Sequence, residues 1–173
     1  AMHDLQMLKA AYAAFDYKPP MKKALLLAKY DGRRDSVRFF AQYMAQGVKD
    51  ARWEVTLVVP VPSHPSSVEK RGHDTALLFA EALAPKLELP LGHDVLKKCY
   101  KTKEQHVLSA EARKTNLLGA FSVEDAESVR GQNILLVDDV LTTGATLNEC
   151  AKMLLGAGAA CCYAVTATVS NGE

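Results

Sequence analysis

The segment of this 173-residue chain best suited to chemistry combines two adjacent carboxylates with several hydroxyl groups and a glycine. Asp138 and Asp139 follow an apolar run, residues 134–137, and precede the turn 142–146, which reads Thr-Thr-Gly-Ala-Thr. Hydroxyl donors suit phosphate oxygens, and a glycine lets the backbone approach a ligand closely. Carboxylates beside a phosphate repel it unless they bind ribose hydroxyls or a divalent cation. The spacing therefore predicts a sugar-phosphate site.

The residues after this turn have a helical period, with Leu147, Cys150 and Leu154 on one face. A helix that begins near Ala145 directs its unpaired N–H groups and the positive end of its dipole at the turn, which favours an anion there. The turn contains no lysine, so it is not the Gly-Lys-Ser/Thr of a Walker motif. The alternative is a buried strand followed by a helix that Asp and Thr side chains merely cap.

This segment resembles the motif that binds 5-phosphoribosyl 1-diphosphate (PRPP) in type I phosphoribosyltransferases: an apolar strand, two acidic residues, two further residues and Thr-Thr-Gly-x-Thr. The resemblance implies that Asp138 and Asp139 hold the ribose hydroxyls and favour positive charge at the anomeric carbon. It also implies Mg²⁺ as the cofactor. The oxygens of PRPP would bind the ion, and Asp138 and Asp139 would interact with it only through PRPP. The substrate-binding residues expected in this segment are Leu141, Thr142, Thr143, Gly144, Ala145 and Thr146.

A second loop, residues 60–74, follows an expected strand over residues 55–59 and opens at the same edge of the sheet. It carries Lys70, Arg71 and Gly72 just before a helix, and cations beside a glycine suit a diphosphate. The alternative is a solvated connection, because exposed Lys and Arg side chains are the rule. Since PRPP needs a partner for its diphosphate at this edge, we expect these three residues to bind it.

A third stretch, residues 101–116, is polar and lies between two expected strands. Such a loop suits closure over a substrate, which excludes water from a reactive ribosyl centre. Lys101, Lys103 and Arg113 are candidates for stabilising the departing diphosphate. A solvated surface loop with a short helix remains an equal alternative.

The remaining sequence alternates between helical and strand patterns, which predicts an α/β fold with a mostly parallel twisted sheet flanked by helices. Ligands of such sheets lie at the carboxyl ends of the strands. We expect one compact domain, with an N-terminal helical hood over residues 1–54 and a phosphoribosyltransferase-like core over residues 55–173. Helices are expected over 3–15, 22–29, 35–47 (capped by Asp35 and Ser36), 74–87, and from Ser109 and Ala145, a loop over 60–67, and strands over 55–59, 95–100, 119–123, 134–137 and 162–168.

The composition of the chain argues against nucleic acid and membranes as binding partners. The net charge of +1 offers no global electrostatic attraction to nucleic acid or an anionic membrane. Direct nucleic-acid binding is therefore not expected, and no apolar run reaches the ~18 residues of a membrane span. The 4 cysteines lack Cys-x-x-Cys spacing and are interpreted as reduced core residues, which favours a cytoplasmic location. A basic cluster is interpreted as a solvated face: Lys22, Lys23, Lys29, Arg33, Arg34 and Arg38.

From residue 24 to residue 169 the chain is similar to the ComF family of phosphoribosyltransferase-like proteins, which are linked to bacterial competence and DNA uptake. This sequence has no cysteine-rich zinc segment, which is either absent by nature or trimmed. It also has His73, Asp74 and Thr75 where the family favours Phe-Asn-Gln, and it lacks an arginine in the 60–70 loop. The matching segments are 27–33, 59–62, 71–74, 102–109 (with Gln105), 113–116, 119–121 and 138–146.

The resemblance implies a Mg²⁺-dependent phosphoribosyltransferase of nucleotide metabolism. It would transfer ribose 5-phosphate from PRPP to an acceptor, with a nucleobase as first candidate, and release pyrophosphate. Residues before about Val55, including Tyr17, are the candidates for recognising the acceptor. Two alternatives remain: a PRPP or nucleotide sensor without turnover, and an interaction module of the DNA-uptake machinery with a helicase-like partner. A homodimer is also left open.

Overall fold

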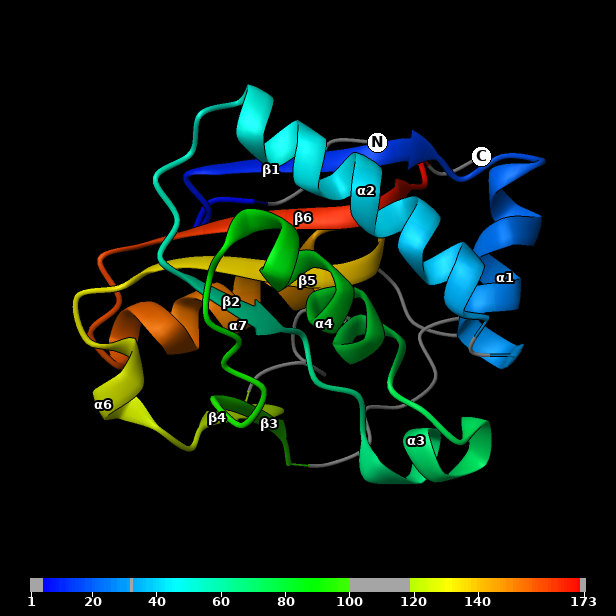
Figure 1. Ribbon diagram of the computed structural model, residues 1–173. Helices are drawn as coiled ribbons and strands as arrows, with labels where there is room; N and C mark the ends of the chain where they lie inside the picture. The colour runs from blue at the N-terminus through cyan, green and yellow to red at the C-terminus, as the bar shows by residue number, and fades with distance from the viewer. Residues whose placement is uncertain (1–4, 32, 100–118, 172–173) are drawn as a thin grey trace.

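The computed structural model describes residues 5–31, 33–99 and 119–171 of the chain. Its centre is a four-stranded parallel sheet in the order β1-β6-β5-β2 (Figure 1). A second sheet pairs β3 (Leu96–Lys98) with β4 (Phe121–Val123) in antiparallel fashion. This arrangement confirms the expected α/β fold with a mostly parallel sheet. The central strands are β1 (Ala10–Asp16), β2 (Leu57–Pro60), β5 (Asn133–Leu141) and β6 (Cys161–Val169).

Helices cover both faces of the central sheet. On one face α2 and α4 pack over the strands, and α7 lies on the other face (Figure 1). None of the described helices combines the length and the apolar character needed to cross a membrane. The helices are α1 (Met21–Asp31), α2 (Arg34–Asp50), α3 (Pro65–Arg71), α4 (Thr75–Leu87), α6 (Ala126–Val129) and α7 (Ala145–Gly156).

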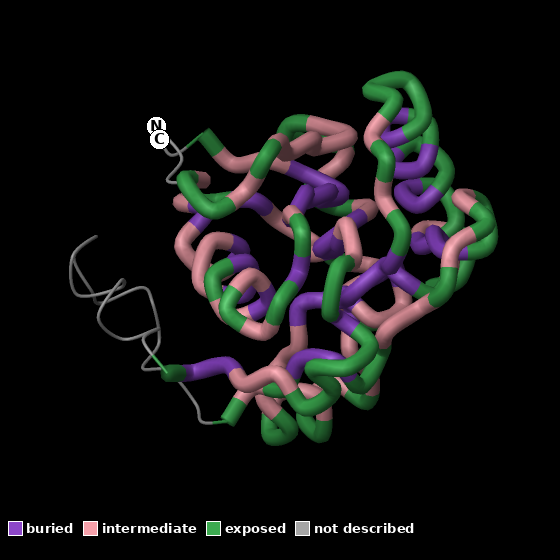
Figure 2. Tube along the Cα trace, turned by 90° about the vertical axis from the view of Figure 1, so that its left-hand side faces the viewer, coloured by how far each residue is buried: buried purple, intermediate pink, exposed green. Residues whose placement is uncertain are grey.

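The apolar run of β5 is explained by its place between these two layers. Leu135 belongs to the buried cluster that contains Phe40 of α2 and Phe79 of α4, whereas Leu136 belongs to the cluster on the opposite face that contains Leu154 of α7. A parallel strand that is covered on both faces needs apolar residues in succession rather than in alternation. Figure 2 shows the resulting distribution, with buried residues gathered in the interior and exposed residues on the outer turns.

The strands place their carboxyl ends at one edge of the sheet, which is where the site residues follow. In the strand register Leu141 pairs with Val169, and Val169 pairs with Asp16. Val137 pairs with Pro60, so the carboxylates after Val137 and the loop after β2 meet at the same edge. The expectation that both loops open together is therefore confirmed.

Three expectations about local structure are wrong. Residues 10–16 form strand β1 instead of the end of a helix, because pairing with β6 outweighs the helix preference of alanine. The loop after β2 contains helix α3, whose N-cap is His64. Helix α2 begins at Arg34 without a side-chain cap, so Asp35 lies in its first turn.

The other expected elements in the described range are present with shifted ends, and the short helix expected from Ser109 lies outside the described residues. The division into a hood and a core at residue 54 stays a prediction, although β1 belongs to the central sheet. The cysteines are free; Cys150 and Cys162 are buried, but Cys99 is exposed, so the core interpretation is wrong for Cys99.

Candidate functional site

The two carboxylates are the sixth and seventh of the nine residues of β5, directly after its fully buried run 134–137. The Asp139 N–H donates to Asp138 Oδ1 at 2.8 Å, and the Val140 N–H donates to Asp139 Oδ1 at 2.8 Å. These bonds orient both side chains against their own backbone. Burial, followed by the charge of Asp139, raises the pKa of the Asp138 carboxyl well above its ordinary value of 3.8. The site therefore holds negative charge at an energetic cost, which a hydroxyl or cation partner relieves.

The turn after β5 has the conformation that its glycine predicts. Gly144 has φ +86° and is the N-cap of α7, without a side-chain hydrogen bond to the helix. The Ala145 N–H donates to Thr143 Oγ1 at 3.3 Å. A small cavity of about 30 Å³ opens here, lined in part by Leu141, Thr142 and Thr146. First-turn N–H groups of a helix attract anions, so this turn suits a phosphate group.

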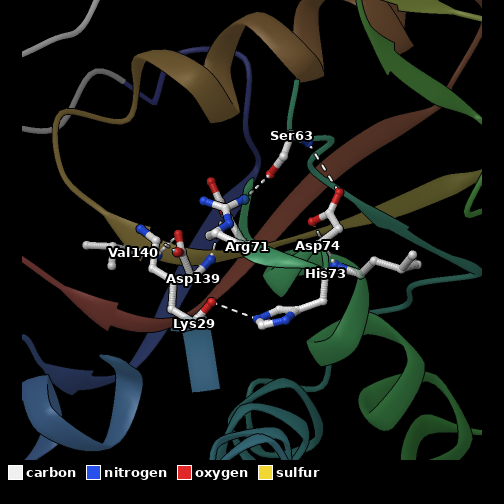
Figure 3. A network of polar contacts seen from close by, with 9 residues as sticks. Lys29, Ser63, Arg71, His73, Asp74, Asp139 and Val140 are labelled. Carbon is white, nitrogen blue, oxygen red and sulfur yellow. Dashed lines mark hydrogen bonds and ion pairs between the residues drawn. The ribbon is translucent and has the colours of Figure 1, made fainter. Parts of the chain in front are cut away.

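Helix α3 presents one of the expected cations to this edge. Arg71 Nη2 donates to Ser63 Oγ at 3.2 Å, and the buried Arg71 Nε has no hydrogen-bond partner among the described residues (Figure 3). The Ser63 N–H in turn donates to Asp74 Oδ2 at 3.3 Å. Asp74 also caps α4, with its Oδ1 accepting from the Leu77 N–H. The residue that replaces the family's asparagine thus has a structural role in holding this loop.

Lys29 reaches the same place from α1. Its Nζ lies 3.3 Å from Asp139 Oδ2, and its side chain is 30% exposed (Figure 3). The charge of Asp139 raises the pKa of Lys29, although burial opposes the shift. The interpretation of Lys29 as part of a solvated face is therefore wrong, whereas the other members of the basic cluster are exposed.

These groups line one cavity of about 290 Å³ with polar walls. Lys98 of β3 also lines it, and burial lowers the pKa of its ammonium group. His64 joins the wall while its Nδ1 accepts from the Ser66 N–H at 3.1 Å, which requires that nitrogen to be unprotonated. The lining residues are Lys29, Val61, Pro62, Ser63, His64, Ser67, Arg71, Lys98, Asp138, Asp139 and Thr146.

The structure brings together only part of the site expected from sequence. Arg71 and Asp138–Thr146 meet at one edge, but Lys70 is exposed on the last turn of α3 and does not line the cavity. Gly72 forms the left-handed C-cap of α3, with φ +80°. Roles for Lys70 and Gly72 in binding stay predictions. Lys101, Lys103, Gln105 and Arg113 lie outside the described residues.

Lys29 and Lys98 were missed as site residues. A signal existed for Lys29, because it lies in the matched segment 27–33, but its surroundings suggested a surface cluster. Lys98 ends an expected strand that precedes a polar loop, which is a weak signal. Both lysines line the cavity only because the fold brings segments that are far apart in the chain into contact.

A second cavity, of about 480 Å³, lies at the carboxyl ends of β1 and β6. Its walls include Tyr17, Lys18 and Lys22 on one side and Ser170 and Asn171 on the other. Lys22 Nζ lies 5.5 Å from the centre of the Tyr17 ring, which is within cation–π range. An aromatic ring, two ammonium groups and polar side chains therefore border a space at the same sheet edge as the carboxylates.

The donor set favours a divalent cation held jointly with a ligand. No cluster of three or more His, Cys, Asp or Glu side chains with metal-binding geometry occurs within residues 5–31, 33–99 and 119–171. Asp138 and Asp139 supply carboxylate oxygens side by side, and Mg²⁺ commonly combines one or two carboxylates with substrate phosphates and water. The residues therefore fit Mg²⁺ that arrives with a phosphorylated ligand.

Comparison with known proteins agrees with this geometry. Residues 73–172 match the family model of the phosphoribosyl transferase domain. The DNA utilization protein YhgH of Salmonella typhi is 34% identical over 150 residues, which are 84% of this chain and 65% of that protein. Competence protein F of Haemophilus influenzae is 31% identical over 144 residues, covering 80% of this chain and 63% of that protein. The chain thus spans just under two thirds of these relatives.

Among solved structures, glutamine PRPP amidotransferase from B. subtilis, complexed with ADP and GMP, has a TM-score of 0.55 and 18% identity. The match covers 83% of this chain and 30% of that one. At this identity the likeness concerns the fold.

Proposed function

Because the chain belongs to the phosphoribosyl transferase domain family, and within it to the ComF proteins, we propose that it binds PRPP and transfers ribose 5-phosphate to an acceptor. The observation that carries the proposal is the meeting of complementary groups at the cavity of about 290 Å³. Carboxylates stand beside the turn that begins α7, and the same cavity is lined by Arg71, whose buried Nε has no hydrogen-bond partner among the described residues. A ribose that carries phosphate at one end and diphosphate at the other has the matching groups.

Each part of the ligand has a partner in this proposal. The turn 142–146 and the first N–H groups of α7 bind the 5-phosphate. Asp138 and Asp139 accept hydrogen bonds from the ribose hydroxyls, and Arg71 binds the diphosphate through its free donor. In the reaction, the bond between C1 and the diphosphate oxygen breaks with both electrons going to pyrophosphate, and a nucleophilic atom of the acceptor bonds to C1. The carboxylates favour the positive charge that develops there.

Mg²⁺ is part of the proposal: Asp138 and Asp139 would hold the ion through the bound ligand, and it would supply positive charge against the diphosphate. The protein side chains keep the roles given above, because they orient the ribose and face the leaving group.

The acceptor is assigned to the cavity of about 480 Å³. Strand β1 lies two positions from β5 in the sheet, a separation of roughly 10 Å. Tyr17 offers a ring for stacking, in agreement with a nucleobase as the first candidate. Replacing Tyr17 with Ala then raises KM for the acceptor more than KM for PRPP.

Thermal shift with PRPP and Mg²⁺ tests the binding step. A ligand that binds only the folded state raises Tm, by an amount set by its concentration relative to Kd. We expect PRPP to raise Tm, the double variant Asp138→Asn, Asp139→Asn to abolish the shift, and Arg71→Met to reduce it. Lys23→Met is the control, because Lys23 is an exposed lysine outside the cavity and was not expected to bind the diphosphate. No shift at millimolar PRPP contradicts the proposal.

A PRPP sensor without turnover is the second candidate. It is favoured by the diphosphate side of the site, where the 60–74 loop contributes Arg71 but not Lys70 to the cavity. Pyrophosphate release with PRPP, Mg²⁺ and a panel of nucleobases separates the two functions. Release identifies a transferase, whereas a thermal shift without release across the panel supports the sensor.

The names of the relatives, DNA utilization protein and competence protein F, support a role in DNA uptake for the whole protein. We place this role in the cytoplasm, with a helicase-like protein as the partner. Co-purification from competent cells tests it. Loss of the partner in Asp139→Asn links the interaction to the PRPP site, and retention makes the interaction independent of it.

A further inference from the structure

Among the described residues, the cation that forms an ion pair with Asp139 comes from helix α1 and not from the 60–74 loop. Lys29 Nζ lies 3.3 Å from Asp139 Oδ2, on the wall of the cavity that also holds Arg71. Lys22 and Lys23 on the same helix are exposed, so the partial burial of Lys29 is specific to this position. Its ammonium group faces the space where the proposed ligand must fit (Figure 3).

The position of Lys29 is set by its backbone as well as by its side chain. His73 Nε2 lies 2.7 Å from the Lys29 carbonyl oxygen, which the imidazole N–H approaches as donor. The last carbonyl groups of a helix lack partners within the helix, so this bond completes the end of α1. Because His73 follows Arg71 by two residues, α1 and the Arg71 turn are held together, and the two cations face one space.

The charges in this space favour an anion beside the ion pair. Lys29, Arg71 and Lys98 contribute three cations against the two carboxylates of Asp138 and Asp139. Arg71 Nε is buried without a partner among the described residues, so the cationic side of the cavity has unused donor capacity. Ribose hydroxyls that bind to Asp139 compete with Lys29 for the oxygens of the Asp139 carboxylate. The displaced ammonium group of Lys29 then lies close to the diphosphate, which is the leaving group.

We propose that Lys29 binds the diphosphate of PRPP together with Arg71, so that α1 adds a cation to the one that α3 contributes. The inference rests on the proposed binding of PRPP. In the free protein Lys29 neutralises Asp139; in the complex the ribose takes its place on the carboxylate, and Lys29 turns to the diphosphate oxygens. The N-terminal helix is thereby a part of the ligand site and not only a cover for it.

Two ligands that differ in the diphosphate test this role. Calorimetry measures Kd for PRPP with Mg²⁺ and for ribose 5-phosphate, which lacks the diphosphate, in the wild type, Lys29→Met and Lys29→Arg. Lys23→Met is the matched control on the same helix. Loss of a charge-assisted bond weakens PRPP binding in Lys29→Met by about ten- to a hundredfold. Ribose 5-phosphate binding stays the same or tightens, and Lys29→Arg retains most of the PRPP affinity.

A labelling measurement on the wild type keeps the test independent of how well the variants fold. Amine acetylation followed by mass spectrometry reports the accessibility of Lys29. Ribose 5-phosphate frees Lys29 from Asp139 and increases its labelling, whereas PRPP with Mg²⁺ protects it. Labelling of Lys23 stays constant with either ligand.

The outcomes separate this inference from the function on which it rests. The inference is wrong if the wild type and Lys29→Met bind PRPP with the same Kd. It is also wrong if Lys29→Met weakens the binding of PRPP and of ribose 5-phosphate by the same factor. In either case Lys29 is only a counterion of Asp139. Equal effects of both ligands on Lys29 labelling also overturn the inference. If the wild type does not bind PRPP at all, the proposed function fails first.

Discussion

The Nε2 atom of His73 lies 2.7 Å from the carbonyl oxygen of Lys29, although the two residues are 44 positions apart in the chain. The side chain of Lys29 continues to Asp139, at 3.3 Å. One residue of α1 is therefore held from both ends, by the turn before α4 and by the end of β5. This relationship brings helix α1 into contact with the edge of the sheet that carries Asp138 and Asp139.

Removing the His73 contact should loosen α1. We expect His73→Ala to lower the free energy of unfolding by about 0.5–1.5 kcal/mol, the usual net value of one hydrogen bond. His73→Gln keeps an N–H donor of similar reach and loses less. Urea unfolding measures both. Equal losses in the two variants would mean that the imidazole acts through packing and not through its bond to the carbonyl.

Asp138→Asn should stabilise the protein in the absence of ligand. Burial raises the pKa of Asp138 in the folded state above its ordinary value of 3.8. The folded state is therefore most stable when Asp138 is protonated. This stability is lost as the pH rises from 3.8 through the pKa of Asp138 in the folded protein. Well above the folded pKa, the ionised carboxylate costs stability that a neutral amide does not. A gain of 1 kcal/mol raises Tm by roughly 2–4 °C at this chain length.

Asp139→Asn is the control for that prediction, because it removes the ion pair with Lys29 and should bring no comparable gain. Thermal scans without ligand, from acid to about pH 8, compare the variants. An advantage of Asp138→Asn that grows as pH rises fits the sign given above. An advantage that grows toward acid would contradict it.

The contribution of Lys29 to stability should disappear at high pH. Asp139 raises the pKa of Lys29 above its ordinary value of 10.5, so the ammonium stabilises the folded state below that value and the contribution falls as pH rises through the folded pKa. The gap in unfolding free energy between the wild type and Lys29→Met is thus expected to be constant near about pH 8 and smaller near about pH 11. Lys23→Met should show no such gap, and a gap that widens above pH 10.5 is the opposite of this expectation.

Gly144→Ala should damage the turn 142–146 directly. Gly144 has φ +86°, and an L-residue in the left-handed region costs roughly 1–2 kcal/mol. We expect Gly144→Ala to lower the Tm and to reduce the rise in Tm that PRPP and Mg²⁺ cause. Gly156→Ala is the matched control at the other end of α7, since an added Cβ meets no atom within 4 Å and its φ is ordinary. Equal stability of the two variants would show that the turn adapts without strain.

The central sheet shows which parts of the fold could be predicted from sequence. Apolar runs predicted β5 and β6, because a strand that is buried on both faces needs apolar residues whichever elements cover it. The alanine-rich segment 10–16 was expected to be helical, and it is a strand because β6 offers a partner. Its conformation depends on a contact with residues 161–169, which local preference cannot encode.

The sequence by itself determined the carboxylates, the turn and the start of α7, because these groups are neighbours in the chain and their geometry follows from strand, glycine and helix. Only the tertiary structure decided that Lys29 reaches Asp139 while Lys70 is exposed and does not line the cavity. The orientation of α1 and the formation of α3 set those two positions. Packing between segments distant in sequence therefore selects which cations meet the carboxylates, and no spacing along the chain records that selection.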